Sequence, residues 1–179
     1  MHYKSLNHNA PAVSFEEAVI LGLAPDKGLY FPEEINPLSQ SFFEKIETLN
    51  NVAIAFEAIK QFVGNEIPEH DLKQILSETL NFDFPITEVE NGVFSLELYH
   101  GPTMAFKDVG ARFMARCLAY FNKKNPTQKN TILVATSGDT GAAVAHAFYQ
   151  QPGVEVVILY PKGKISLLQE KLFTTLGQN

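Results

Sequence analysis

Cysteine is nearly absent from this sequence: Cys117 is the only one in 179 residues. A single cysteine excludes an internal disulfide, and no Cys/His framework for a structural zinc accompanies it. No apolar run approaches the ~18 residues of a membrane span. The polar stretch 1–11 lacks the apolar core of a signal peptide. From these absences we expect a cytoplasmic protein with no metal centre and no membrane partner.

Basic charge is also scarce. Acidic residues outnumber Lys and Arg by 20 to 14, which gives a net charge of -6. This balance argues against a non-specific nucleic-acid binder, which needs a basic surplus. The charge is uneven, because residues 1–90 carry five lysines, no arginine and 15 acidic residues, whereas residues 91–179 carry a net charge of +4. The second half is therefore the part suited to an anionic small ligand.

The first half of the chain is predicted to be helical and shows no clear chemistry. Ser14 and Glu17 have the spacing of a capping box, which opens a helix that ends near Leu21. Apolar periodicity and helix start and stop signals predict three more helices. These helices span residues 42–49, 52–63 and 68–80.

The pattern changes at residue 86. Two short runs flank Asn91-Gly92, a strong signal for a β-hairpin. Helices and buried strands then alternate: a helix over 107–123, a strand over 131–135, a helix over 141–150, a strand over 154–160 and a helix over 166–176. This alternation predicts right-handed βαβ units and a mostly parallel sheet. We therefore predict an α/β fold with a helical region at 1–90 and an α/β domain at 91–179.

The predicted helix over 107–123 has one apolar stripe. Cys117 lies on this stripe, which predicts a buried and inert thiol. Asp108 and Arg112 are spaced i, i+4, which favours local support of the helix.

Ligands of parallel sheets bind at the carboxyl ends of the strands, so the loops 99–107, 136–141 and 161–166 are the candidate sites. Lys107 ends the first loop at a predicted helix start. The helix dipole and partial burial would both favour a neutral amine there. A neutral amine is what Schiff-base chemistry needs, although position alone fits an ordinary solvent-facing lysine better.

The other two loops are polar and rich in potential anion donors. Residues 136–141 (TSGDTG) form a glycine-rich turn whose N–H groups and hydroxyls could bind a phosphate or a carboxylate. The alternative is a tight turn in which Ser137 or Asp139 caps the helix. Residues 160–166 carry two lysines and could also receive an anion, or could form an ordinary basic surface loop.

Taken together, these segments resemble the threonine synthases, pyridoxal-phosphate (PLP) enzymes with the tryptophan-synthase-β-like fold. The stretch 101–110 (GPTMAFKDVG) resembles the lysine motif of that family. The stretch 137–141 (SGDTG) resembles its second motif, in which bacterial and fungal members carry Asp where most relatives of the fold have Asn. Residues 14–30 and 160–177 resemble the family's opening and its third stretch. The resemblance covers almost the whole chain, in the same order.

The resemblance implies a site and a reaction. Lys107 would hold PLP as a Schiff base and shuttle protons as the catalytic residue. Phe106 would pack on the pyridine ring, and Asp139 would lie by the PLP 3′-oxygen. The substrate would be O-phospho-L-homoserine, which water converts to L-threonine and phosphate. The residues implied in substrate binding are Ser137, Gly138, Thr140, Lys164, Ser166 and Gln169.

The chain also departs from the family pattern. Leu167 stands where Pro is expected, and Lys164 stands where Arg is usual. Family members are more than twice as long, and their glycine-rich cup for the cofactor phosphate lies further downstream. We therefore expect an N-terminal portion that binds PLP weakly and does not turn over alone. Its expected partners are a small-molecule substrate, the remainder of the enzyme and a second copy in a homodimer.

Two other functions remain open at this point. Another PLP-dependent lyase or dehydratase of the same fold is one, and Asp139 in place of Asn argues against it. A non-catalytic anion- or PLP-binding fragment is the other, and the retained Lys107 argues against it, because a binding module needs no amine there.

Overall fold

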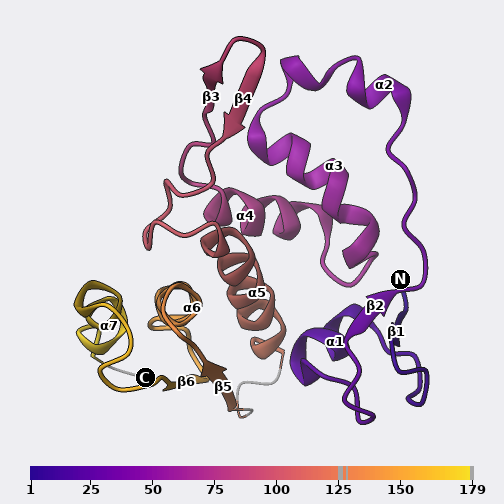
Figure 1. The fold of residues 1–179 in the computed structure, drawn as a ribbon. Coiled ribbons are helices and arrows are strands. Elements are labelled where there is room, and N and C mark those ends of the chain that lie inside the picture. The colour runs from indigo at the N-terminus through magenta and orange to yellow at the C-terminus, as the bar shows by residue number, and fades with distance from the viewer. Residues whose placement is uncertain (125–126, 128, 178–179) are drawn as a thin grey trace. The chain divides into compact units, whose positions relative to one another are not determined.

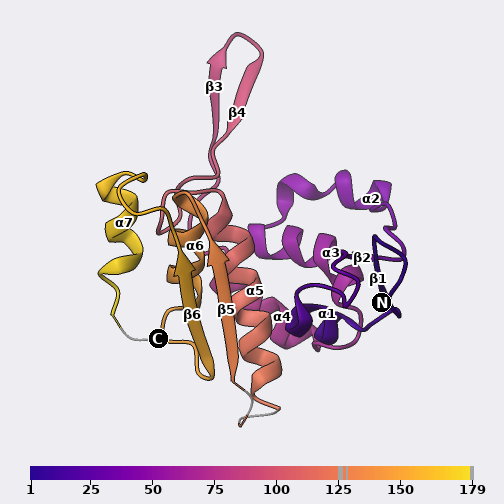
Figure 2. The ribbon, with the colours of Figure 1, turned by 60° about the horizontal axis from the view of Figure 1, so that its bottom comes forward.

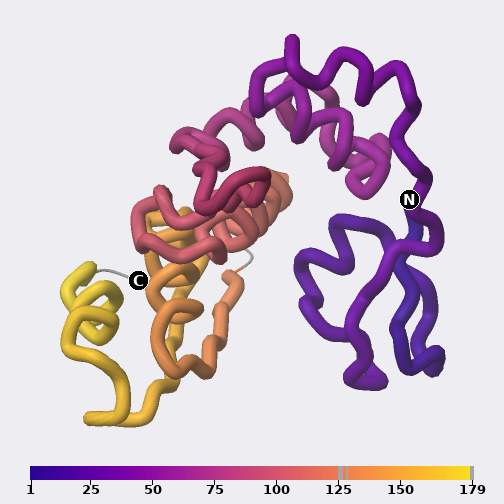
Figure 3. Tube along the Cα trace, turned by 45° about the horizontal axis from the view of Figure 1, so that its top comes forward, coloured from indigo at the N-terminus to yellow at the C-terminus, as the bar shows by residue number. Residues whose placement is uncertain are grey.

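The structure is a computed structural model that describes residues 1–124, 127 and 129–177. It divides into two units, Met1–Leu80 and Asn81–Asn179 (Figure 1). Each unit is one continuous stretch of chain, so the trace passes from one to the other once (Figure 3). The division lies ten residues before the predicted boundary at 90. Among the residues described, no helix is long and apolar enough to cross a membrane.

The first unit contains helices and one small sheet. Its elements are β1 (Tyr3–Ser5), α1 (Phe15–Leu21), β2 (Tyr30–Pro32), α2 (Gln40–Phe43), the 3-10 helix η1 (Ile46–Thr48), α3 (Asn51–Val63) and α4 (Glu69–Thr79). Strands β1 and β2 pair antiparallel. The sequence did not predict them, because three-residue strands are too short to show a period of two.

The first helix confirms the predicted capping box. The Ser14 side chain accepts from the Glu17 N–H, and the Glu17 carboxylate accepts from the Ser14 N–H. A second carboxylate, that of Glu66, accepts from the N–H groups of Phe15 and Glu16 at 2.9 and 2.8 Å. Charged acceptors at a helix N-terminus are stabilising. Helix α1 is therefore held both locally and from a residue about fifty positions away.

The predicted helix over 42–49 is wrong. Helix α2 ends at Phe43, and η1 begins at Ile46. The Lys45 N–H donates to the Phe42 carbonyl, and the Thr48 N–H donates to the Lys45 carbonyl. These bonds join residues three apart and close the tighter 3-10 turn instead of an α-helix.

The second unit follows the predicted alternation of strands and helices. Its elements are β3 (Ile86–Glu90), β4 (Val93–Leu96), α5 (Lys107–Asn122), β5 (Asn130–Ala135), α6 (Asp139–Phe148), β6 (Val154–Leu159) and α7 (Leu167–Thr174). The β3–β4 hairpin is antiparallel and extends away from the helices of its own unit (Figure 2). Strands β5 and β6 run parallel, from the pair Asn130–Val154 to the pair Ala135–Leu159. Helix α6 packs against both α5 and α7.

In the part of the chain that the structure describes, helices cover one face of the β5–β6 sheet. Ala142 and Ala145 of α6 and Phe173 of α7 form a buried cluster, against which Ile158 and Tyr160 pack. The opposite face carries the register pairs Thr131–Glu155, Leu133–Val157 and Ala135–Leu159, and all six of these residues are exposed. The prediction that both strands are buried is therefore wrong for this face, because helices cover the other face alone in the part of the chain that is described.

Candidate active site

A buried carboxylate fixes the loop that leads to Lys107. Asp108 is fully buried, and its Oδ1 and Oδ2 accept from the Oγ1 and N–H of Thr103 at 2.6 and 2.9 Å. Gly101 lies so close that a Cβ there would come within 2.5 Å of Asp108 Oδ2. The loop is thus pinned at the residue that directly follows Lys107.

The spacing of Asp108 and Arg112 predicts only local helix support, and it does not reveal that the Asp108 carboxylate is buried and bonded to Thr103. The signal that could have revealed it is a hydroxyl five positions before an Asp at a helix start, with a glycine just upstream. Such a carboxylate is well placed to close its own loop, as short polar side chains commonly do.

Phe106 and Lys107 directly precede Asp108, whose hydrogen bonds with Thr103 we call the Asp108–Thr103 anchor. Lys107 is the first residue of α5, as predicted. Its side chain is partly buried, and its Nζ lies 4.5 Å from the centroid of the Phe106 ring. Phe106 is 61% exposed. Asp108 is buried, whereas the Lys107 amine and the exposed Phe106 ring lie in contact at the start of the helix.

The glycine-rich turn between β5 and α6 is held by Thr136. Its Oγ1 accepts from the N–H groups of Gly138 and Gly141, both at 3.0 Å. The alternative in which Ser137 or Asp139 caps the helix is therefore wrong, because the threonine at the end of the strand already fills that position. Ser137 and Asp139 are exposed, and Thr140 is partly buried. None of these three side chains is used to cap α6.

The third loop places a glutamine beside Asp139. Ser166 caps α7 as predicted, and Gln169 completes a capping box with it. The Gln169 Nε2 donates to Asp139 Oδ1 at 2.7 Å. Lys164 is exposed, and its backbone N–H donates to the Pro161 carbonyl.

The structure therefore brings the candidate residues together in two groups. One group is Phe106 and Lys107. The other is Gly138, Asp139, Ser166 and Gln169. Between the two groups, no hydrogen bond or ring contact is recorded for the residues that the structure describes. They belong to the same unit, and the second group gathers where β5 and β6 end side by side.

Cys117 takes no part in this chemistry. It is buried in α5, as predicted. Burial raises the pKa of its thiol to about 12, so it carries no thiolate near neutral pH. Within the described ranges, no group of three or more His, Cys, Asp or Glu side chains is arranged to hold a metal ion.

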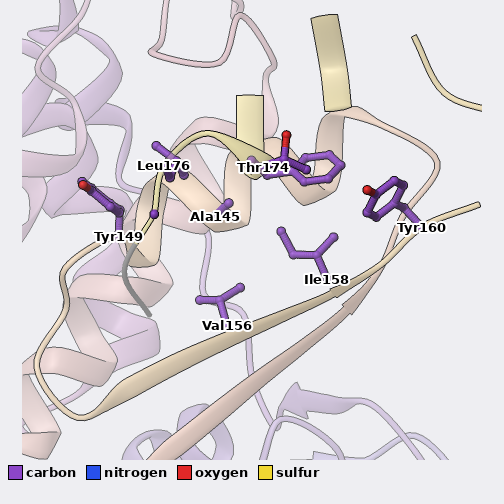
Figure 4. A pocket seen from close by; sticks show the side chains of 9 residues that line it. Ala145, Tyr149, Val156, Ile158, Tyr160, Thr174 and Leu176 are labelled. Carbon is purple, nitrogen blue, oxygen red and sulfur yellow. The ribbon is translucent and has the colours of Figure 1, made fainter. Parts of the chain in front are cut away.

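A pocket of about 410 Å³ lies in the second unit between β6, α6 and α7 (Figure 4). The side chains of Val156 and Ile158 line one side of it, and Thr174 of α7 and Leu176, just after that helix, lie across from them. Phe173 also lines the pocket. None of the candidate residues lines this pocket. It is therefore separate from the Lys107 loop and from the Asp139 turn.

Comparisons with known proteins point to one family. A family model described as "Threonine synthase N terminus" matches residues 2–80. Threonine synthase of Escherichia coli strain K12 is 49% identical over 177 residues, which cover 99% of this chain and 40% of that protein. The chain thus spans about 40% of the length of such relatives.

Solved structures agree with the sequence comparisons. The crystal structure of threonine synthase from Escherichia coli matches with a TM-score of 0.91 and 47% identity, over 99% of this chain and 41% of that one. The structure of PLP-bound threonine synthase from Brucella melitensis matches with a TM-score of 0.85 and 36% identity, over 96% of this chain and 38% of that one. The predicted α/β fold is confirmed.

Proposed function

Since the chain is related, over almost its whole length, to the N-terminal part of threonine synthases, we propose that it supplies the lysine-bearing part of such an enzyme. The enzyme converts O-phospho-L-homoserine and water into L-threonine and phosphate, with PLP as cofactor. The observation that carries this proposal is the placement of Lys107. Its amine lies at the start of α5 beside the Phe106 ring. The next residue, Asp108, holds the preceding loop through its hydrogen bonds with Thr103.

The residues present fit part of the cofactor. A primary amine next to an exposed aromatic ring suits an aldehyde carried on a flat heteroaromatic ring. The turn before α6 adds an exposed carboxylate, Asp139, and the hydroxyls of Ser137 and Thr140. The N–H groups of Asp139 and Thr140, in the first turn of α6, have no acceptor within the helix. They are available to an anionic group of the cofactor or substrate.

Each of these residues has a role in the proposed reaction. PLP, when bound, withdraws electrons from the substrate carbons. Lys107 holds the cofactor and afterwards carries protons on its Nζ to and from the substrate. Phe106 packs on the cofactor ring, and Asp139 faces its 3′-oxygen. Donors of the turn at 137–140 bind the substrate's carboxylate or phosphate, and Lys164 adds a positive charge for the phosphate.

The rest of the enzyme is the proposed partner. The exposed face of β5–β6 carries Leu133, Val157 and Leu159 in register, and contiguous apolar surface of this kind marks an interaction site. The polypeptide that makes up the other ~60% of the relatives covers this face. In this proposal, residues 1–90 are a helical region and residues 91–179 the lysine-bearing domain. Pairing of two complete enzymes is a further expectation, to which we assign no surface.

The proposal also gives the protein a compartment. O-phospho-L-homoserine is a charged phosphate ester, and charged groups enter a bilayer at high cost. An enzyme that uses it therefore works in the compartment where the substrate is made, which we propose is the cytoplasm.

The experiment combines this chain with the polypeptide that follows the matched region in the Escherichia coli enzyme. With PLP and O-phospho-L-homoserine, the mixture releases phosphate and L-threonine, whereas either piece alone releases none. The Lys107→Ala chain serves as the control and abolishes turnover. Ammonia release from threonine without phosphate release from O-phospho-L-homoserine would instead assign a dehydratase.

A further inference from the structure

Gln169 joins the starts of two helices. Its Nε2, on α7, donates to Oδ1 of Asp139, on α6, at 2.7 Å. Its Oε1 accepts from the Oγ and N–H of Ser166 at 3.0 and 3.4 Å. Both ends of the amide are thereby engaged, so the network fixes which end faces Asp139.

The backbone around Asp139 accommodates this side chain. Gly138 directly precedes Asp139 and adopts φ 155° and ψ −101°, a conformation that L-residues rarely take. A Cβ at Gly138 would lie 2.5 Å from Gln169 Nε2. The missing side chain at 138 therefore leaves the space through which Gln169 reaches the carboxylate.

The contact leaves half of the Asp139 carboxylate available. Gln169 reaches Oδ1, and among the residues that the structure describes no hydrogen bond to Oδ2 is seen on this exposed side chain. An exposed aspartate otherwise samples several rotamers, and ordering it at the moment of binding costs affinity. A neutral amide donor orders the group without adding a charge beside it.

We propose that Gln169 is a positioning residue: it holds the Asp139 carboxylate ready for the 3′-oxygen of PLP and does not contact the substrate. This inference rests on the proposed function and refines the substrate-binding role that the family resemblance implies for Gln169. It differs from that role in one measurable way. A positioning residue acts on cofactor binding before any substrate is added.

The test compares Gln169→Ala and Gln169→Glu with the control Lys171→Ala, an exposed position on the same helix. PLP is titrated into each chain without substrate, and the dissociation constant and the absorption band of bound PLP are recorded against pH. Loss of the amide raises the dissociation constant roughly tenfold, the factor that corresponds to about 1.4 kcal/mol. It also shifts the pH dependence of the band. Gln169→Glu has the larger effect, because it sets a second carboxylate against Asp139. Lys171→Ala changes neither quantity.

A second readout needs no cofactor. The carboxyl carbon of Asp139, observed by NMR in the PLP-free chain, changes its chemical shift in Gln169→Ala and keeps it in Lys171→Ala.

The outcomes separate this inference from the proposed function. Capture of PLP on Lys107 with identical binding and band in Gln169→Ala and Lys171→Ala overturns the positioning role and leaves the function standing. An unchanged Asp139 signal in Gln169→Ala overturns the contact itself. If the unmodified chain captures no PLP on Lys107, even when combined with the C-terminal polypeptide, the function and the positioning role both fail.

Discussion

The two units expose apolar side chains in different ways. In the first unit these residues are scattered over loops and short elements, for example Leu6, Leu23 and Ile35. In the second unit many of them lie on paired strands, where Leu133 and Val157 are register partners on one exposed sheet face. Scattered exposed side chains are ordinary, whereas contiguous ones mark an interface. The second unit, which carries the candidate site residues, is therefore also the unit with an exposed apolar sheet face that is typical of an interface.

The difference in net charge between the two units is smaller than the difference between residues 1–90 and residues 91–179. The first unit has five lysines and 12 acidic residues, a net charge of -7, and the second has nine basic and eight acidic residues, a net charge of +1. The contrast shrinks because Asp83, Glu88 and Glu90 belong to the second unit. The second unit is therefore suited to an anionic ligand by the hydrogen-bond donors in the loops after its strands. Its overall net charge contributes little.

A pair of leucine variants gives the largest expected effect. Leu72 is 1% exposed and Leu133 is 65% exposed. Leu72→Ala lowers the free energy of unfolding by about 2–5 kcal/mol, because it leaves a cavity. Leu133→Ala changes it by less than about 0.5 kcal/mol in this chain. Urea unfolding followed by circular dichroism measures both. A loss above about 1 kcal/mol for Leu133→Ala would mean that this sheet face is already covered.

The anchor of the lysine loop is the next test. Thr103→Val removes the hydroxyl that donates to buried Asp108 at 2.6 Å. Leaving a buried carboxylate short of a donor costs about 1–3 kcal/mol. The exposed Thr87 supplies the control, Thr87→Val, which changes stability by less than about 0.5 kcal/mol. Equal unfolding midpoints for the two variants would contradict the claim that the Thr103–Asp108 hydrogen bond stabilises this loop.

Alkaline pH acts on the second unit through Cys117. Its pKa is raised from 9.0 to about 12 by burial, so the unfolded chain ionises first. The stability from the buried neutral thiol is complete below pH 9 and is lost as the pH rises toward 12, at about 1.4 kcal/mol per pH unit. Unfolding between pH 8 and 10 shows a decline that Cys117→Ala flattens. The same slope in Cys117→Ala would assign the decline to other groups.

Acid acts on the first unit through Asp26, with the smallest expected effect. The hydrogen bond from Ser5 Oγ, followed by the N–H groups of Gly28 and Asn9, holds the pKa of this carboxyl below its ordinary value of 3.8. The stabilisation is present above pH 3.8 and is lost as the pH falls through the lower pKa of the folded chain. Asp26→Asn reduces the loss of stability below pH 4. If Asp26→Asn loses stability below pH 4 as steeply as the unmodified chain, Asp26 is not the cause of that loss.

Local signals predicted the elements that short stretches specify. The capping box at Ser14, the Asn91-Gly92 hairpin and the helix that begins at Lys107 need only neighbouring residues, and all three are confirmed. Features that join distant residues were missed. Strand β1 pairs with β2 some 25 residues later, and Glu66 holds α1 from far along the chain. Periodicity carries no information about such partners.

The candidate site divides in the same way. Family resemblance named Lys107, Asp139 and Gln169, but only the folded chain shows that Gln169 donates to Asp139. The turn at 136–141 gave the same lesson, because both Thr136 and Ser137 can cap a helix and the structure decides between them.

Capture of PLP is the most direct test of the account. The chain is incubated with increasing PLP, reduced with borohydride and digested, and each modified lysine is identified by mass spectrometry. The account predicts that Lys107 is modified at the lowest PLP concentration, well before the exposed Lys162 and Lys164, and that Lys107→Ala loses this modification alone. Equal modification of all exposed lysines, with no preference for Lys107, would contradict it.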